Sequence, residues 1–163
     1  MSSDDSFISG VAYPQPFAEL AIELAESASR YLHILSPALD HDAFGSNALE
    51  SAISGLARSS QQTQVRILIK DSRAMVSRGH PLLVLARRMP SSVSIRKLTD
   101  HPDWHGQTLV IRDRDGVLFK PGEANKDGFY EPDSRASTER HYELFQELWR
   151  FSEDDPNLRT LSL

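Results

Sequence analysis

Two loops of this 163-residue sequence contain side chains that could bind an anion or attack a substrate, and the first is the segment 71–80. Its candidate anion-binding residues are Arg73, Arg78, Gly79 and His80. Guanidinium groups suit phosphate and carboxylate oxygens, glycine lets the backbone approach a ligand, and a helix beginning at Pro81 would present free amide groups. We therefore expect an anion to bind there. The alternative is an ordinary helix entry in which Gly79 forms the turn and His80 is a cap or a surface residue.

The second loop, residues 101–107, carries two histidines. His105 stands just before an apolar run, and a histidine at a strand entrance can act as nucleophile or base, although a lone loop histidine is more often structural. His101 lies four residues earlier, but Pro102 is incompatible with a helical metal-binding pair, and no third ligand is near in the sequence. We expect no metal site. The sequence also lacks the Walker loop, the dinucleotide fingerprint and the Gly-x-Ser-x-Gly elbow, so no cofactor is expected.

The overall composition is that of one globular domain. Apolar residues make up 39% and charged residues 25%, and the absence of cysteine excludes disulfides, thiolate zinc sites and a cysteine nucleophile. No apolar run approaches the roughly 20 residues of a membrane-spanning helix. The first residues are acidic, where a signal peptide would be basic. These features predict a cytoplasmic protein that makes no contact with membranes.

Charge is unevenly distributed along the chain. The formal net charge is −5, yet residues 64–97 carry eight basic side chains and one acidic side chain. We call this segment the basic band. The segments before and after it, residues 1–63 and 98–163, each have a net charge of −6. The band could hold RNA, DNA, a nucleotide or an acidic protein, or it could pair with its own acidic flanks.

Hydrophobic periodicity predicts alternating helices and strands. Helices are expected at 16–28, 44–58, 81–89 and 137–152, and strands at 31–36, 65–69, 93–95, 108–111 and 117–120. The last two strands should form a hairpin, and 71–80 should be a loop. After the N-terminal helix the order is βαβαβββα, which predicts an α/β fold with a single mixed β-sheet flanked by helices. This single domain would cover residues 15–163, after an N-terminal tail over residues 1–14.

Two segments resemble motifs of the phospholipase D-like superfamily. Residues 105–113, with the sequence HGQTLVIRD, resemble its His-x-Lys-x4-Asp strand, and residues 122–125, with the sequence GEAN, are similar to its Gly-Ser-x-x-Asn turn. The element order from about residue 30 to 152, including the last helix with FQELW at 145–149, also resembles one half of that fold. The resemblance implies a phospholipase D-like half-fold. Sites of this superfamily generally form where two such halves meet, so it also implies a homodimer or another protein partner.

The departures from the family pattern concern activity. In the family the histidine attacks phosphorus and the lysine holds phosphate oxygens, whereas here Gln107 has the lysine position and Arg112 the aspartate position. Glutamine gives no positive charge to the developing phosphorane, and such electrostatic stabilisation is usually the largest catalytic contribution. The resemblance therefore implies a degenerate site in which His105, Gln107 and Asn125 contact an anion without cleaving it. The turn with Asn125 also comes later than the family spacing.

As a whole-chain pattern, the sequence is similar to a family of uncharacterised bacterial domains that occur alone or appended to GNAT-type acetyltransferases. The similarity rests on residues 78–90 (RGHPLLVLARRMP) and 148–159 (LWRFSEDDPNLR). Some relatives are labelled acetyltransferases because of the attached domain. This chain contains no Arg/Gln-x-x-Gly-x-Gly/Ala pyrophosphate loop, so the acetyltransferase label does not transfer to it.

Three hypotheses on function follow. The first is a non-catalytic binding or interaction module that holds a phosphate-bearing or other anionic partner through the basic band, above all Arg73, Arg78 and His80. The second is a residual phosphodiesterase with His105 as its nucleophile and a basic residue from elsewhere in place of the lysine. The third is a structural partner domain of a larger complex. Steep salt dependence of binding would favour the first over the third.

Overall fold

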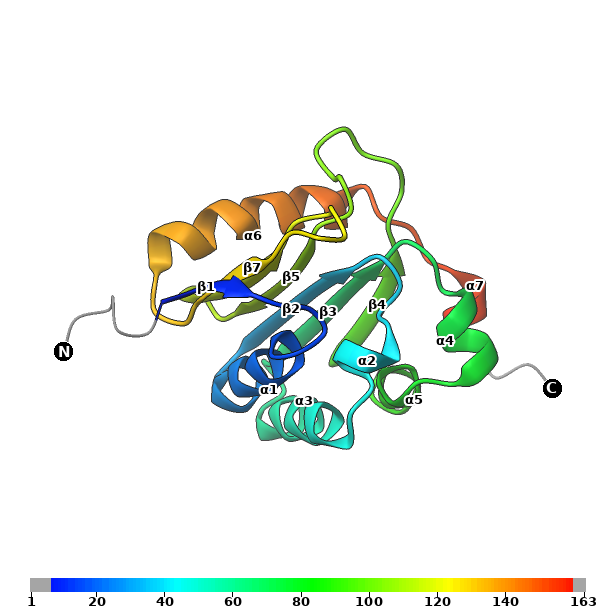
Figure 1. The fold of residues 1–163 in the computed structure, drawn as a ribbon. Coiled ribbons are helices and arrows are strands. Elements are labelled where there is room, and N and C mark those ends of the chain that lie inside the picture. Colours follow the sequence, from blue (N-terminus) through cyan, green and yellow to red (C-terminus); the bar gives the residue numbers. More distant parts are fainter. Residues whose placement is uncertain (1–6, 160–163) are drawn as a thin grey trace.

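A seven-stranded mixed β-sheet forms the centre of the computed structural model, which describes residues 7–159 (Figure 1). The strands are β1 (Ile8–Val11), β2 (Tyr31–Ser36), β3 (Gln64–Ile69), β4 (Val93–Lys97), β5 (Thr108–Arg112), β6 (Gly116–Lys120) and β7 (Gly128–Glu131). Their order is β1-β7-β6-β5-β2-β3-β4. β2, β3 and β4 are parallel, and the remaining pairs are antiparallel. The predicted single mixed sheet is confirmed.

Helices cover both faces of this sheet, as Figure 1 shows. The long helices are α1 (Phe17–Ser27), α3 (Asn47–Ser59), α5 (Pro81–Arg88) and α6 (Arg135–Arg150). α1, α3 and α5 pack on one face, and α6 packs alone on the other. Three short helices are α2 (His41–Phe44), α4 (Arg73–Arg78) and α7 (Pro156–Arg159). Because β2 is covered on both sides, its run of apolar residues has no polar alternation.

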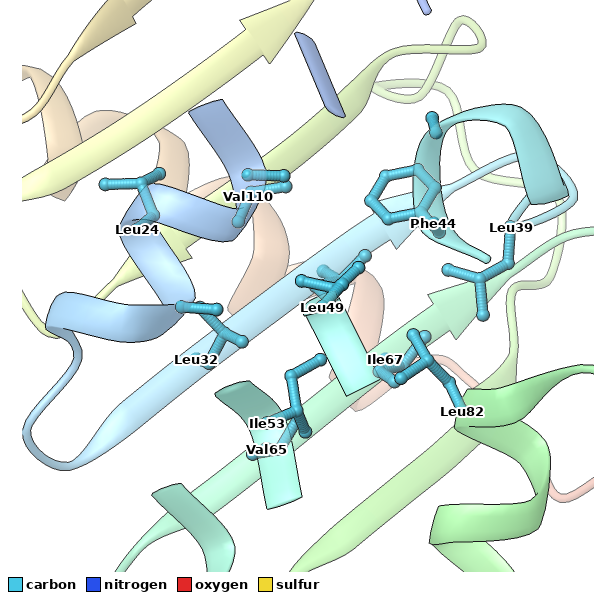
Figure 2. Packing of buried hydrophobic residues seen from close by; sticks show 14 of the residues in the cluster. Leu24, Leu32, Leu39, Phe44, Leu49, Ile53, Val65, Ile67, Leu82 and Val110 are labelled. Atoms are coloured by element: carbon cyan, nitrogen blue, oxygen red, sulfur yellow. The ribbon is translucent and has the colours of Figure 1, made fainter. Parts of the chain in front are cut away.

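The larger hydrophobic core lies between the sheet and α1, α3 and α5 (Figure 2). Its members include Leu24, Leu32, Leu49, Ile53, Val65, Ile67, Leu82 and Val110, all at most 1% exposed. A smaller core lies under α6 and contains Leu35, Ile111, Phe145 and Leu148. Alternate residues of β2 and β5 thus enter opposite cores, as strand geometry requires.

Several local elements differ from the sequence-based expectation, and they include the short helices α2 and α7, which were not expected. The predicted tail over residues 1–14 contains strand β1, which pairs with β7, a second strand that was not expected. Residues 1–6 of that tail lie outside the described part. Both strands are short and contain glycine, and β1 is largely exposed, so neither has a clear apolar alternation. The predicted loop 71–80 contains helix α4, whose only buried residue is Met75.

Candidate functional site

The loops at the carboxyl ends of the parallel strands form the candidate site. β5 runs antiparallel to β2 and pairs Leu109 with Leu35, so the entry to β5 lies where β2 ends. The connection 98–107 between β4 and β5 and the connection 121–127 between β6 and β7 therefore meet the loops that follow β2 and β3. Ligands of open α/β sheets bind at this edge.

His105 is exposed in the connection that leads into β5, and Gln107 holds this connection in shape. The Oε1 atom of Gln107 accepts a hydrogen bond from the backbone N–H of His105, and its Nε2 atom donates to the carbonyl of Asp103 at 3.3 Å. The indole Nε1 of Trp104 donates to the Gln107 carbonyl at 3.1 Å. The amide at the position of the family's lysine thus binds the backbone of its own loop.

The two segments that resemble phospholipase D-like motifs lie against each other. A Cβ atom on Gly122 would stand 1.9 Å from the carbonyl oxygen of His105, so only glycine permits this approach. Asn125 is exposed in the same connection, three residues after Gly122. Arg112 lies at the far end of β5, where its Nη2 atom is 2.9 Å from Asp115.

Sequence reasoning missed a polar cluster beside this edge. The hydroxyl of Tyr13 donates to the Asp40 carboxylate at 2.5 and 2.7 Å, and burial together with this hydrogen bond raises the pKa of Tyr13. The ammonium of Lys120 lies 5.3 Å from the centre of the Tyr13 ring and donates to the carbonyl of Pro121 at 3.0 Å. These residues are far apart in the sequence and belong to no recognisable motif, so the sequence alone could not predict that they form a cluster.

His80 is a buried helix cap. Its side chain is the N-cap of α5, and its Nδ1 atom accepts the N–H of Leu82 at 3.1 Å. Burial, and next the neighbouring His41, lower the pKa of His80 to about 4, so its ring is neutral near pH 7. The Nε2 atom of His41 lies 2.7 Å from the carbonyl oxygen of Gly79, which has a φ of 77°. This arrangement matches the alternative interpretation, an ordinary helix entry with a histidine cap.

One of the two arginines predicted for the same anion site already pairs with an acidic side chain. The guanidinium of Arg73 forms two contacts of 2.7 and 3.0 Å with Asp71, and this pairing lowers the pKa of the Asp71 carboxyl to about 2. Arg78 is exposed at the end of α4, and in the described part of the chain it forms no ion pair. Pro81 has no N–H, and His80 takes the Leu82 amide, so two amide positions at the α5 terminus offer nothing to an anion.

Much of the basic band is neutralised by acidic side chains. The flank pairs are Lys70–Asp100 at 2.5 Å, Arg88–Glu50 at 3.5 Å and Arg96–Asp154 at 2.8 Å. With Arg73–Asp71, at least half of the eight basic residues have a carboxylate partner within the described residues 7–159. Among residues 7–159 no group of three or more histidine, cysteine or acidic side chains is arranged to hold a metal ion. In the same range no helix has the length and hydrophobicity to cross a bilayer.

Solved structures support the fold. Nuc from Salmonella typhimurium, a phospholipase D family member, matches with a TM-score of 0.64 at 17% identity over 95% of this chain and 99% of its own. NucT from Helicobacter pylori matches with a TM-score of 0.57 at 12% identity, covering 92% and 98% of the two chains. The archaeal chromatin protein TrmBL2, reported with a novel mode of DNA binding, matches with a TM-score of 0.65 at 15% identity, and the 91% of this chain that aligns spans 53% of that protein.

These likenesses establish a phospholipase D-like fold for the chain. No curated protein sequence matches it significantly. The sequence of residues 13–161 matches one family model, which is described as a domain of unknown function, DUF7931. Since this match covers most of the chain, the protein belongs to the DUF7931 family.

Proposed function

We propose that this protein is a non-catalytic binding module that uses a phospholipase D-like fold to hold a phosphate-bearing partner. The Gln107 side chain carries the proposal. It stands at the position of the family's catalytic lysine, has no charge, and uses both ends of its amide on the backbone of its own loop. A phosphorane next to His105 would lack the cation that the family's lysine supplies to its developing charge.

Nucleic acid is the partner that the comparisons favour. TrmBL2 is a chromatin protein that binds DNA, and it has a similar fold. At the candidate edge of this chain, His105 and Asn125 are exposed, and Lys120 has no carboxylate partner within residues 7–159. We propose that these side chains, together with Arg78, contact the phosphates of a bound strand. Arg73, Gly79, His80 and Gln107 would shape the loops behind them.

The test is the binding of a fluorescently labelled DNA oligonucleotide at two salt concentrations. A protein that neutralises several phosphates loses affinity steeply between about 50 and 200 mM salt. We expect Arg78→Ala and Lys120→Ala each to weaken binding, whereas Arg58→Ala, which removes an exposed arginine of α3, should have no effect. Binding that does not change with salt, or an equal loss in all three variants, would contradict the proposal.

A structural role in a larger complex is the second candidate. The ion pairs between the basic band and its acidic flanks favour it, because Lys70, Arg88 and Arg96 already have partners inside the chain. In that case the protein binds no polyanion at low salt. Purification with a stable protein partner from the native cell would then support this role.

A further inference from the structure

Three segments meet at the end of the sheet opposite the candidate site, and each contributes an arginine. Arg30 precedes β2, Arg114 lies in the turn between β5 and β6, and Arg135 is the first residue of α6. Asp113 ties the first two segments together, because its carboxylate accepts the backbone N–H groups of residues 29, 30 and 31 at 2.8–3.0 Å. The turn is tied to α6 by a hydrogen bond of 2.8 Å from the backbone N–H of Ser134 to the Asp115 carbonyl.

Two adjoining cavities lie between these segments. The smaller has a volume of about 120 Å³ and is lined by Arg114, Arg135, Thr138, Glu139 and Tyr142. The larger has a volume of about 270 Å³, and its lining includes Arg30, Tyr31, Arg114 and Arg135. Arg114 and Arg135 thus line both. The volume of the smaller cavity is several times the roughly 30 Å³ that one water molecule occupies in the liquid. The cavity therefore has room for a polar group larger than water.

The arginines of this cluster have no carboxylate partners in the part of the chain that the structure describes. Arg30 donates to the neutral amide of Gln62 at 2.8 Å, and the Arg114 guanidinium lies 5.2 Å from the centre of the Tyr142 ring. The nearby carboxylates are engaged elsewhere, since Asp113 binds backbone amides and Asp115 pairs with Arg112 at 2.9 Å. Glu139 is the one acidic residue that lines the smaller cavity. The two arginines and Glu139 therefore give the lining of the smaller cavity a formal charge of +1, while Asp113 and Asp115 also line the larger cavity.

A buried hydroxyl gives independent support. Thr138 lines the smaller cavity, is fully buried, and its Oγ1 atom has no hydrogen-bond partner among residues 7–159. Such groups are rare in folded proteins, and a bound water or ion is one established reason for them. Thr138 is in the first turns of the sixteen-residue helix α6, where the dipole favours an anion. The cavity, its two arginines and this hydroxyl together point to an anionic ligand.

We propose that this cluster binds the phosphate group of a small phosphomonoester. The phosphate would lie in the smaller cavity between Arg114 and Arg135, where guanidinium groups offer paired donors to phosphate oxygens. The rest of the molecule would lie in the larger cavity beside Arg30 and Tyr31. This site is at the other end of the sheet from the candidate edge, so it is independent of the proposed function.

The experiment is a titration of the ¹⁵N-labelled protein with inorganic phosphate, ribose 5-phosphate and AMP, followed by NMR. Saturable shifts are expected for amides around Arg30, Arg114 and Arg135, and both phosphomonoesters should bind more tightly than inorganic phosphate. The double variant Arg114→Gln/Arg135→Gln should lose about tenfold or more in affinity, because it removes charge-assisted hydrogen bonds. Arg58→Gln, which lies outside both sites, should bind as the wild type does.

Three outcomes would overturn the assignment. The first is the absence of saturable shifts at this cluster with any of the three anions. The second is a loss of phosphate binding in Arg78→Gln and not in the double variant, which would locate the anion at the candidate edge. The third is a response of the cluster to a DNA oligonucleotide alone, which would make it part of a nucleic-acid surface. Unchanged thermal unfolding of the double variant excludes loss of fold as the cause.

Discussion

At the scale of single residues, we expect Gln107 to limit the chemistry that His105 can perform. A histidine that attacks a phosphodiester needs a cation for the charge that develops on the phosphate oxygens, and a neutral amide bound to its own loop is not one. We expect the protein to hydrolyse bis-p-nitrophenyl phosphate no faster than its His105→Ala variant. Turnover well above background in the wild type, abolished in His105→Ala, would instead support the residual phosphodiesterase.

The buried His80 makes the stability of the folded protein depend on pH. Burial lowers its pKa to about 4 in the folded state, below its ordinary value of 6.5. Between pH 6.5 and pH 4 this histidine is therefore protonated in the unfolded chain and neutral in the folded chain. The free energy of unfolding falls as the pH drops through this range. For one such histidine, linkage gives a loss of about 2 kcal/mol between pH 7 and pH 5. Above pH 6.5 this contribution is fully present.

Urea unfolding at pH 7 and pH 5 measures this effect. His80→Asn keeps a side chain that caps helices well and removes the titrating ring, so its stability should depend less on pH than that of the wild type. His105→Asn is the matched control, because His105 is exposed. His33 is also buried, its pKa is lowered to about 3, and it maintains part of the pH dependence in both variants. Identical pH dependence in the wild type and His80→Asn would refute the buried-cap argument.

At the scale of elements, Gly122 decides whether the two loops of the candidate site can touch. A Cβ atom there would stand 1.9 Å from the carbonyl oxygen of His105, so Gly122→Ala must push the connection 121–127 away from the connection 98–107. Backbone displacement of this kind costs about 1–3 kcal/mol. Thermal unfolding should show the lower stability, and amide shifts should change around both residues.

Gly55 provides the control for that substitution. It lies in the interior of α3 on an exposed face, and a Cβ atom at this position would have no neighbour within 4 Å. Gly55→Ala should therefore stabilise the protein by about 0.5–1 kcal/mol, since alanine favours helix more than glycine does. If both alanine variants changed stability in the same direction, steric contact at Gly122 would not be the cause.

The elements differ in how far the sequence could predict them. Tyr31–Ser36 was predicted with its observed ends, because it is a short apolar run followed by Pro37. β7 begins with Gly128, a residue that a strand pattern disfavours, and a Cβ atom on Gly128 would stand 1.7 Å from the carbonyl oxygen of Phe119. Such a contact exists only once β6 is in place. Strands whose stability comes from pairing partners distant in sequence escape a local pattern.

At the scale of the whole molecule, the sequence predicted which loops form the candidate edge better than it predicted their chemistry. The order of strands and helices brings the connection carrying His105 to the carboxyl end of β2. Charge counts along the chain could not reveal that Lys70 meets Asp100 or that Arg96 meets Asp154, since these pairs depend on tertiary structure. The basic band therefore overstates the positive charge available to a ligand.

The resemblance to half of a phospholipase D-like protein predicts a homodimer. A phospholipase D-like site generally forms where two halves meet, and this chain supplies one half with one candidate histidine, His105. If the packing surface is retained, two copies associate about a twofold axis, which is the commonest symmetry of homo-oligomers. The half-buried Trp104 and the start of β5 would then lie against the partner copy.

Trp104→Glu should dissociate such a dimer, because it would bury an unpaired charge at the interface. Light scattering near physiological salt measures the mass of the particle. Twice the 18.3 kDa of the chain is expected for the wild type. A mass near 18.3 kDa at every accessible concentration would rule out a site shared between two copies.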